Sequence, residues 1–94
     1  MNFVVSIDQR FTNYNFVEDV LDFHINGRRK SVLCYVDFHP FLETYATEHH
    51  ILLKRVELKE ITKGYYVVII GENNSLLKKC KELKLKQCLI REEI

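Results

Sequence analysis

Tyr65-Tyr66-Val67-Val68-Ile69-Ile70 is the longest apolar run of the chain, and it decides the fold. Such a run predicts a strand whose two faces are both buried. Lys63-Gly64 predicts a turn just before it, and Gly71 ends it. Its six residues fall far short of the roughly 20 that cross a bilayer. The run therefore belongs to a globular core, where we expect it to be the central strand.

Shorter apolar runs on either side predict the other elements. Strands are expected at residues 3–7, at 31–38, from Ile51 onward and at 87–90, and helices at 16–25, from Pro40 and after Asn73. The order is β-α-β-α-β-β followed by an α-β extension. The predicted fold class is thus α/β (α+β): one domain, residues 1–94, built as a two-layer sandwich with a mixed sheet. Antiparallel pairing is expected for the two strands that Lys63-Gly64 joins.

The segment 16–25 fits two structures. Asn15 as a cap and Glu18 in the first turn favour a helix, and so does an apolar stripe at helical spacing. That stripe consists of Phe16, Val20 and Phe23, with Val17 and Leu21 beside them. Alternating apolar and polar residues over 21–25, followed by Asn26-Gly27, favour a hairpin strand instead. We predict the helix, because its cap, its acidic start and its stripe agree with one another.

Composition narrows the class of protein. Fourteen Lys and Arg against 13 Asp and Glu give a net charge of +1, without the basic excess typical of nucleic-acid binders. Three cysteines are an odd number, which argues against a secreted disulfide framework. The first residues lack the basic start of a signal peptide. We expect a cytoplasmic protein that does not enter a membrane.

The residues that most often carry chemistry show no catalytic pattern. Cys34, Cys80 and Cys88 lie in apolar segments and are predicted to pack in the core. The histidines are His24, His39, His49 and His50. His49-His50 are adjacent, so they point in different directions, and we expect a solvated helix end rather than a metal site. Glycine-rich phosphate loops and a nucleophile elbow are also absent from the sequence. No cofactor is predicted, and a non-enzymatic role is favoured.

One candidate ligand site follows from the order of elements. If a helix joins two parallel strands, Asp8 and Asp37 lie near the carboxyl ends of those strands, where open α/β sheets bind ligands. Arg10 and His39 follow them closely. The hypothesis is that Asp8, Arg10, Asp37 and His39 line a polar cleft. The alternative is that the two aspartates only end strands and help a helix begin.

A basic cluster offers a second possibility. Lys78, Lys79 and Lys81 lie on the third predicted helix and spread over its polar arc, as a solvated amphipathic face does. With Arg28, Arg29 and Lys30 they are candidates for an RNA or DNA surface. We favour the solvated face and keep nucleic-acid binding as the alternative function.

The element order resembles that of the small sulfur-carrier family often called TusA or SirA. The likeness runs over residues 3–71 and includes Ile7-Asp8 at a strand end and Asp37-Phe38-His39-Pro40 before a helix. The family's reactive cysteine belongs to a Cys-Pro pair at the start of its first helix, where this chain has Asn13-Tyr14-Asn15-Phe16. The resemblance therefore implies a related fold and a degenerate ligand cleft, without the sulfur chemistry.

Two ways of covering the central strand remain open. The first two predicted helices can cover one face of the sheet, so either the third helix or a second subunit covers the other. We hypothesise a homodimer. The favoured function is that of a non-enzymatic protein acting through self-association or a protein partner.

Overall fold

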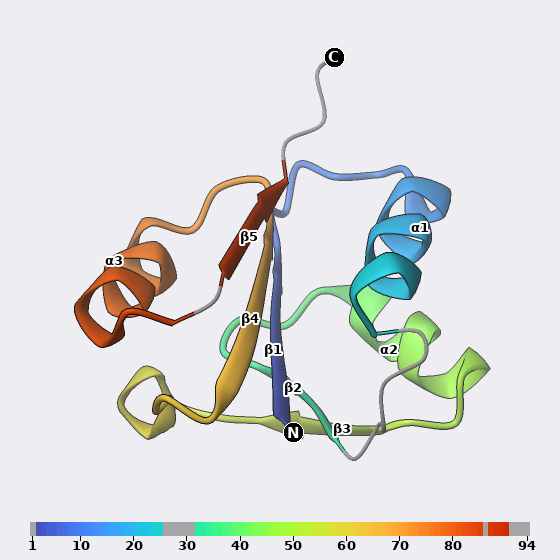
Figure 1. Cartoon of the computed structure of the whole chain (residues 1–94). Coiled ribbons are helices and arrows are strands. Elements are labelled where there is room, and N and C mark those ends of the chain that lie inside the picture. Colours follow the sequence, from blue (N-terminus) through green and yellow to red (C-terminus); the bar gives the residue numbers. More distant parts are fainter. Residues whose placement is uncertain (1, 26–31, 86, 91–94) are drawn as a thin grey trace.

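Five parallel strands form one sheet in this computed structural model, which describes residues 2–25, 32–85 and 87–90. The strands are β1 (Asn2–Ile7), β2 (Val32–Tyr35), β3 (Leu52–Arg55), β4 (Tyr65–Ile70) and β5 (Gln87–Ile90). Their order in the sheet is β3-β2-β1-β4-β5. Helices α1 (Tyr14–Ile25) and α2 (Pro40–Glu48) cover one face, whereas α3 (Asn74–Leu83) and the 3-10 turn η1 (Leu58–Glu60) cover the other (Figure 1).

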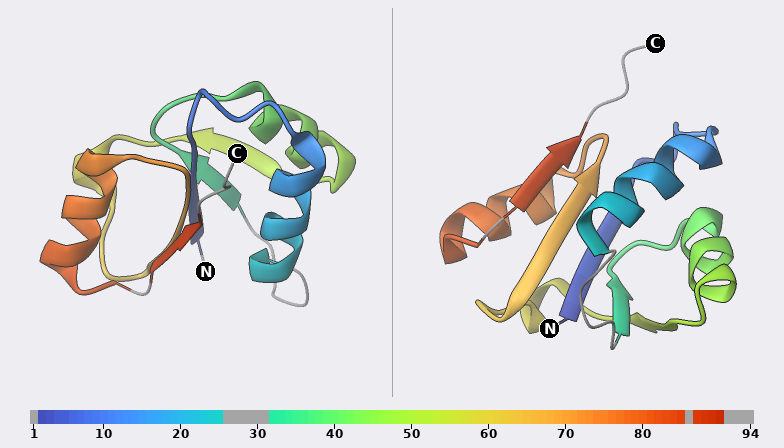
Figure 2. Two further views of the ribbon diagram at one scale, coloured as in Figure 1. Left: turned by 90° about the horizontal axis from the view of Figure 1, so that it is seen from above. Right: turned by 45° about the vertical axis from the view of Figure 1, so that its right-hand side comes forward.

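The predicted α/β class and the order of strands and helices are confirmed, but three details of the sheet are wrong. Every strand pair is parallel, so the sheet is not mixed. Helices on both faces make three layers rather than two (Figure 2). The central strand is β1, with β4 beside it.

The reason for the error is the connection from β3 to β4, which is a crossover and not a hairpin. Residues 56–64 carry the chain from the edge strand past β2 and β1, with η1 on the way. Val56 and Ile61 are buried against the sheet on this path, so they hold the connection to its face. Lys63-Gly64 lies at the end of this crossover, before β4.

Alternation along β1 and β4 divides the core in two. Phe3, Val5 and Ile7 belong to the cluster that contains the buried residues of α1 and α2, whereas Val4 belongs to the cluster of α3. Leu76 and Cys80 of α3 are buried in this second cluster. The third helix therefore covers the second face. The homodimer hypothesis assumed that this face was uncovered, so its basis is gone.

Segment 14–25 is helical, as predicted, although its details differ. The cap is Asn13 and not Asn15, because the Asn13 Oδ1 accepts a hydrogen bond from the Phe16 N–H at 3.2 Å. The buried stripe consists of Val17, Leu21 and Ile25, while Phe23 is 82% exposed. Phe16 and Val20 are partly buried at its side. Val17 and Leu21, which were predicted beside the stripe, thus form its buried centre with Ile25, and the prediction is wrong for Phe23.

The other helix starts agree with the sequence. Pro40 occupies the first turn of α2 after the cap His39, and Asn73 caps α3. Cys34 and Cys80 are buried, as predicted, whereas the side chain of Cys88 lies outside the described residues. None of the helices in the described ranges is long and apolar enough to cross a membrane.

Candidate functional site

The carboxyl ends of β1 and β4 adjoin a hollow of about 530 Å³. It is lined by Ser6, Ile7, Asp8, Gln9, Asp37, Phe38, Glu72 and Asn73. The chain leaves β1 toward α1 on one face and leaves β4 toward α3 on the other (Figure 1). The loops after two neighbouring strands therefore diverge, which creates the kind of switch point where open α/β sheets bind ligands.

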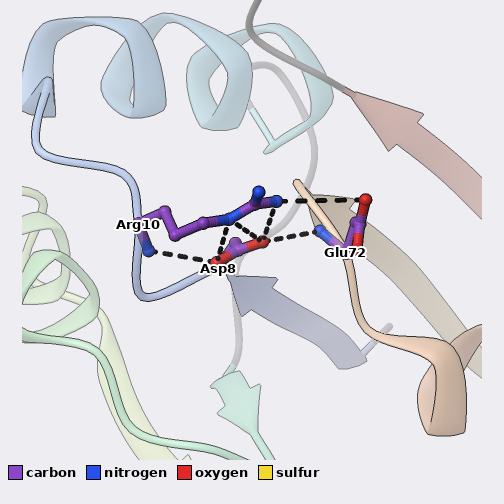
Figure 3. A network of polar contacts seen from close by, with 3 residues as sticks. All are labelled: Asp8, Arg10 and Glu72. Atoms are coloured by element: carbon purple, nitrogen blue, oxygen red, sulfur yellow. Dashed lines mark hydrogen bonds and ion pairs between the residues drawn. The ribbon is translucent and has the colours of Figure 1, made fainter.

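Asp8 is the most strongly bonded residue of the hollow. Its Oδ2 accepts hydrogen bonds from the Arg10 Nη2 at 2.7 Å and from the Glu72 N–H at 3.2 Å, and its Oδ1 accepts one from the Arg10 N–H at 3.0 Å (Figure 3). The Asp8 side chain is only 13% exposed. Hydrogen bonds from Arg10, first from its side chain and then from its backbone, lower the pKa of Asp8 to about 2. Asp8 is therefore an anion at any physiological pH.

Gly71 lets the two loops of the switch point meet. Its φ of +88° is in the left-handed region, and a Cβ at this position would lie 2.4 Å from the Asp8 Cβ and 2.7 Å from the Phe11 ring. The Asp8 N–H also donates to the Ile70 carbonyl at 2.8 Å. The β4–α3 loop is thus fixed against the β1–α1 loop, and the floor of the hollow is rigidly defined.

Asn73 joins α3 to the end of β1. Its Oδ1 accepts a hydrogen bond from the Leu76 N–H at 3.1 Å, which caps the helix, and its Nδ2 donates to the Ser6 Oγ at 2.9 Å. Ser6 is 6% exposed and points from β1 toward this cap. The hydroxyl of Ser6 is therefore part of the wall and is already hydrogen bonded.

The opposite wall comes from the loop after β2. The Gln9 Nε2 donates a hydrogen bond to the Phe38 carbonyl at 2.9 Å, which ties this loop to the one after β1. Asp37 and Glu72 both line the hollow and are exposed, so their carboxylates are accessible to a ligand. Phe38 is 46% exposed and packs edge-on against Tyr35.

His39 is separate from this set, because its ring is buried and has a structural role. The Nδ1 accepts a hydrogen bond from the Phe41 N–H at 3.1 Å, so the proton of the neutral ring is on Nε2. Burial lowers the pKa of His39, and the Phe11 backbone and the Asp8 charge act in the opposite direction. His39 is therefore the cap of α2 and does not line the hollow.

Of the four residues that the sequence suggested, the structure thus brings Asp8 and Asp37 to one hollow and pairs Arg10 with Asp8. Sequence reasoning missed the contribution of β4, namely Glu72 and Asn73. Gly71-Glu72-Asn73 directly follows the longest apolar run, which was a usable signal. To place Glu72 and Asn73 beside Asp8, however, one must know that β4 is parallel to β1 and adjacent to it.

Half of the predicted basic surface can be described. Lys78 and Lys81 are exposed, and Lys78 and Lys79 line a shallow hollow with Lys59 and Glu82. Arg28, Arg29 and Lys30 lie outside the described residues. Glu82 lies among these lysines, and its negative charge would repel a phosphate. The cluster therefore fits a solvated face better than a phosphate-binding surface. Nucleic-acid binding stays a prediction.

Comparison with known proteins adds no relative. No family model, curated protein or solved structure matches the chain.

Proposed function

We propose that the chain is a non-enzymatic domain that binds a small polar ligand, neutral or cationic, at the carboxyl edge of its sheet. The observation that carries the proposal is the hollow at the switch point, to which three loops contribute hydrogen-bonding side chains. A sulfur-carrier relative that had lost its cysteine would keep such a cleft, so the resemblance is compatible with this function. The buried free thiols of Cys34 and Cys80 suit a reducing compartment, and we propose the cytoplasm.

Binding is favoured over catalysis by the chemistry of the lining. The hydroxyl of Ser6 is engaged by Asn73, and the lining of the described hollow includes neither histidine nor cysteine. Burial raises the pKa of the Cys34 and Cys80 thiols, so neither is an activated nucleophile. In the part of the chain that the structure describes, the hollow thus lacks a nucleophile paired with a base.

The charges of the hollow define the ligand class. The carboxylates of Asp8, Asp37 and Glu72 line the hollow, and the Arg10 guanidinium lies 2.7 Å from that of Asp8 and 4.0 Å from that of Glu72. Asp37 and Glu72 are both exposed acceptors: within the described residues Asp37 has no ion pair, and Glu72 makes only the long one with Arg10. Acceptors of this kind bind amines and sugar hydroxyls and repel anions.

Titrations followed by protein NMR test the proposal with three probes: putrescine as a diamine, ribose as a polyol and inorganic phosphate as an anion. We expect putrescine or ribose to shift the amide signals around Asp37 and Glu72, and phosphate to leave them unchanged. Asp37→Asn and Glu72→Gln should each weaken that binding at least tenfold. The matched control is Glu43→Gln, an exposed acid on α2 outside the hollow.

Two outcomes would contradict the proposal. Phosphate binding in place of the other two probes would show that the charge argument is wrong. Equal weakening by Glu43→Gln would show a general charge effect without a site.

Self-association is a second candidate, because large apolar side chains are exposed on α1 and on the edge strand β3. Leu52 is 73% exposed on the edge strand β3, and Phe23 is 82% exposed on α1. Light scattering over a hundredfold range of concentration tests it, with Leu52→Ser as the disrupting variant. A constant monomeric mass for the wild type would eliminate this candidate.

A further inference from the structure

We propose that a divalent transition-metal ion, best matched by Zn²⁺, binds between α1 and α2 through Glu18, Glu48 and His49. One potential ligand atom from each of these residues lies within 4.8 Å of the other two. The set mixes one imidazole with two carboxylates, which is a common donor combination for zinc.

The separations suit a metal better than direct contacts among the side chains. The His49 Nε2 lies 3.6 Å from the Glu18 Oε2 and 3.8 Å from the Asp22 Oδ1, too far for hydrogen bonds of ordinary length. Ligands that lie about 2.1 Å from zinc at the corners of a tetrahedron are about 3.4 Å apart. The Glu18 and His49 atoms thus already have about the spacing of two ligands of one zinc ion, and the Glu48 carboxylate, within 4.8 Å of both, would move closer to complete the set.

One polar atom of this region also points to a missing ligand. The His49 Nε2 is buried and makes no hydrogen bond within the described residues, although the His49 side chain as a whole is 26% exposed. Buried polar atoms are rarely left unpaired in proteins. An ion on Nε2 would satisfy the histidine.

Tyr45 positions the surrounding groups. Its hydroxyl donates a hydrogen bond to the Asp22 Oδ1 at 2.8 Å, and its ring stacks on the His49 ring with centroids 4.1 Å apart. Zinc sites are ordinarily supported by such neighbours, which fix the orientation of the ligands. Asp22 serves here as an outer carboxylate, and Tyr45 as a positioning residue.

Charge favours a cation at the same place. Glu18, Asp22 and Glu48 bring three carboxylates together, and in the described part of the chain no lysine or arginine forms an ion pair with them. His49 as an imidazolium is the competing occupant, because a proton would also satisfy it. The two occupants can be distinguished by measurement, because a bound metal ion can be counted per protein chain and a proton cannot.

The test is calorimetry of the full chain, freed of metal by a chelator, with ZnCl₂ and with MgCl₂ for comparison. We expect one Zn²⁺ per chain and no binding of Mg²⁺. His49→Gln and Glu18→Gln should weaken zinc at least tenfold, and Tyr45→Phe about tenfold. The control is His50→Gln, since His50 is the exposed neighbour in sequence and should leave affinity unchanged.

Spectroscopy with Co²⁺ identifies the donors. Coordination by nitrogen and oxygen predicts weak visible bands without the intense near-ultraviolet band of a thiolate, which excludes a site made by cysteines. Failure to bind zinc would overturn the proposal and favour the imidazolium, and so would a thiolate band or unchanged affinity in His49→Gln. If one variant loses its native circular dichroism, the other two still decide the question.

Discussion

Gly71→Ala is the sharpest test of how the switch point is built. Two costs add at this position. An alanine at a φ of +88° is strained by about 1 kcal/mol. Its Cβ would meet the Asp8 Cβ at 2.4 Å. The Asp8 carboxylate is held by hydrogen bonds from Arg10 and from the Glu72 N–H, so the chain must move at a further cost of about 1–3 kcal/mol.

The sum is a loss of about 2–4 kcal/mol from a domain whose total stability is on the order of 5–14 kcal/mol. Urea unfolding followed by circular dichroism measures it, and the melting temperature should fall by about 10–25 °C. The matched control is Gly64→Ala, because a Cβ there meets nothing within 4 Å. We expect that variant to stay within about 0.5 kcal/mol of the wild type. Equal stability losses in the two variants would refute the argument from the loop contact.

Three further predictions concern the same edge and the core. The pKa of Asp8 is lowered to about 2, so its stabilising contribution is present above about pH 4 and is lost as the pH falls toward 2. Asp8→Asn should remove that acid dependence in urea titrations and cost about 1 kcal/mol, since solvent screens the pair with the exposed Arg10; an unchanged acid limb would contradict the assignment. Asn73→Ala should cost about 1–2 kcal/mol through the lost cap, whereas the exposed Asn74→Ala should be nearly neutral, and the reverse order would place the cap elsewhere. Cys34 and Cys80 should react with a thiol reagent only on unfolding, and rapid labelling of either in the native protein would show that it is accessible.

The order of helices and strands could be predicted from the sequence, whereas the direction in which the strands pair could not. The run 65–70, the Pro40 helix start and the helix caps offered by Asn73, Asn74 and Ser75 are local signals; the first two are in place, and the cap is Asn73. Strand direction is not local, because it depends on where the chain goes between β3 and β4. Lys63-Gly64 has the composition of a tight turn, but Val56 and Ile61 gain burial only when the segment crosses the sheet. The predicted turn at residues 63–64 does form, but it ends a crossover and does not join a hairpin, because burial of Val56 and Ile61 requires the chain to cross the sheet.

The candidate sites show the same division. Asp8 and Asp37 were predicted together because each ends a strand, and this needs only the alternation of strands and helices. Glu18 and His49 were not connected, because 31 positions separate them in sequence and only the packing of α1 beside α2 brings them within 3.6 Å. The i and i+4 spacing of Glu18 and Asp22 was visible on its own, but exposed acids with that spacing are common on helices.

The hollow also differs from an ordinary nucleotide site in a way that bears on its ligand. At the switch point of doubly wound folds, a glycine-rich loop and a helix N-terminus usually present backbone N–H groups to a phosphate. In this chain the loop after β1 contains no glycine, and the Asp8 carboxylate accepts hydrogen bonds from the N–H groups of Arg10 and Glu72. A carboxylate whose pKa is about 2 remains charged at neutral pH, so a phosphate near it would meet a fixed anion. The Asp8 carboxylate therefore takes the place that a phosphate has in those folds. The space that remains beside Asp37 and Glu72 is suited to hydrogen-bond donors rather than to phosphate.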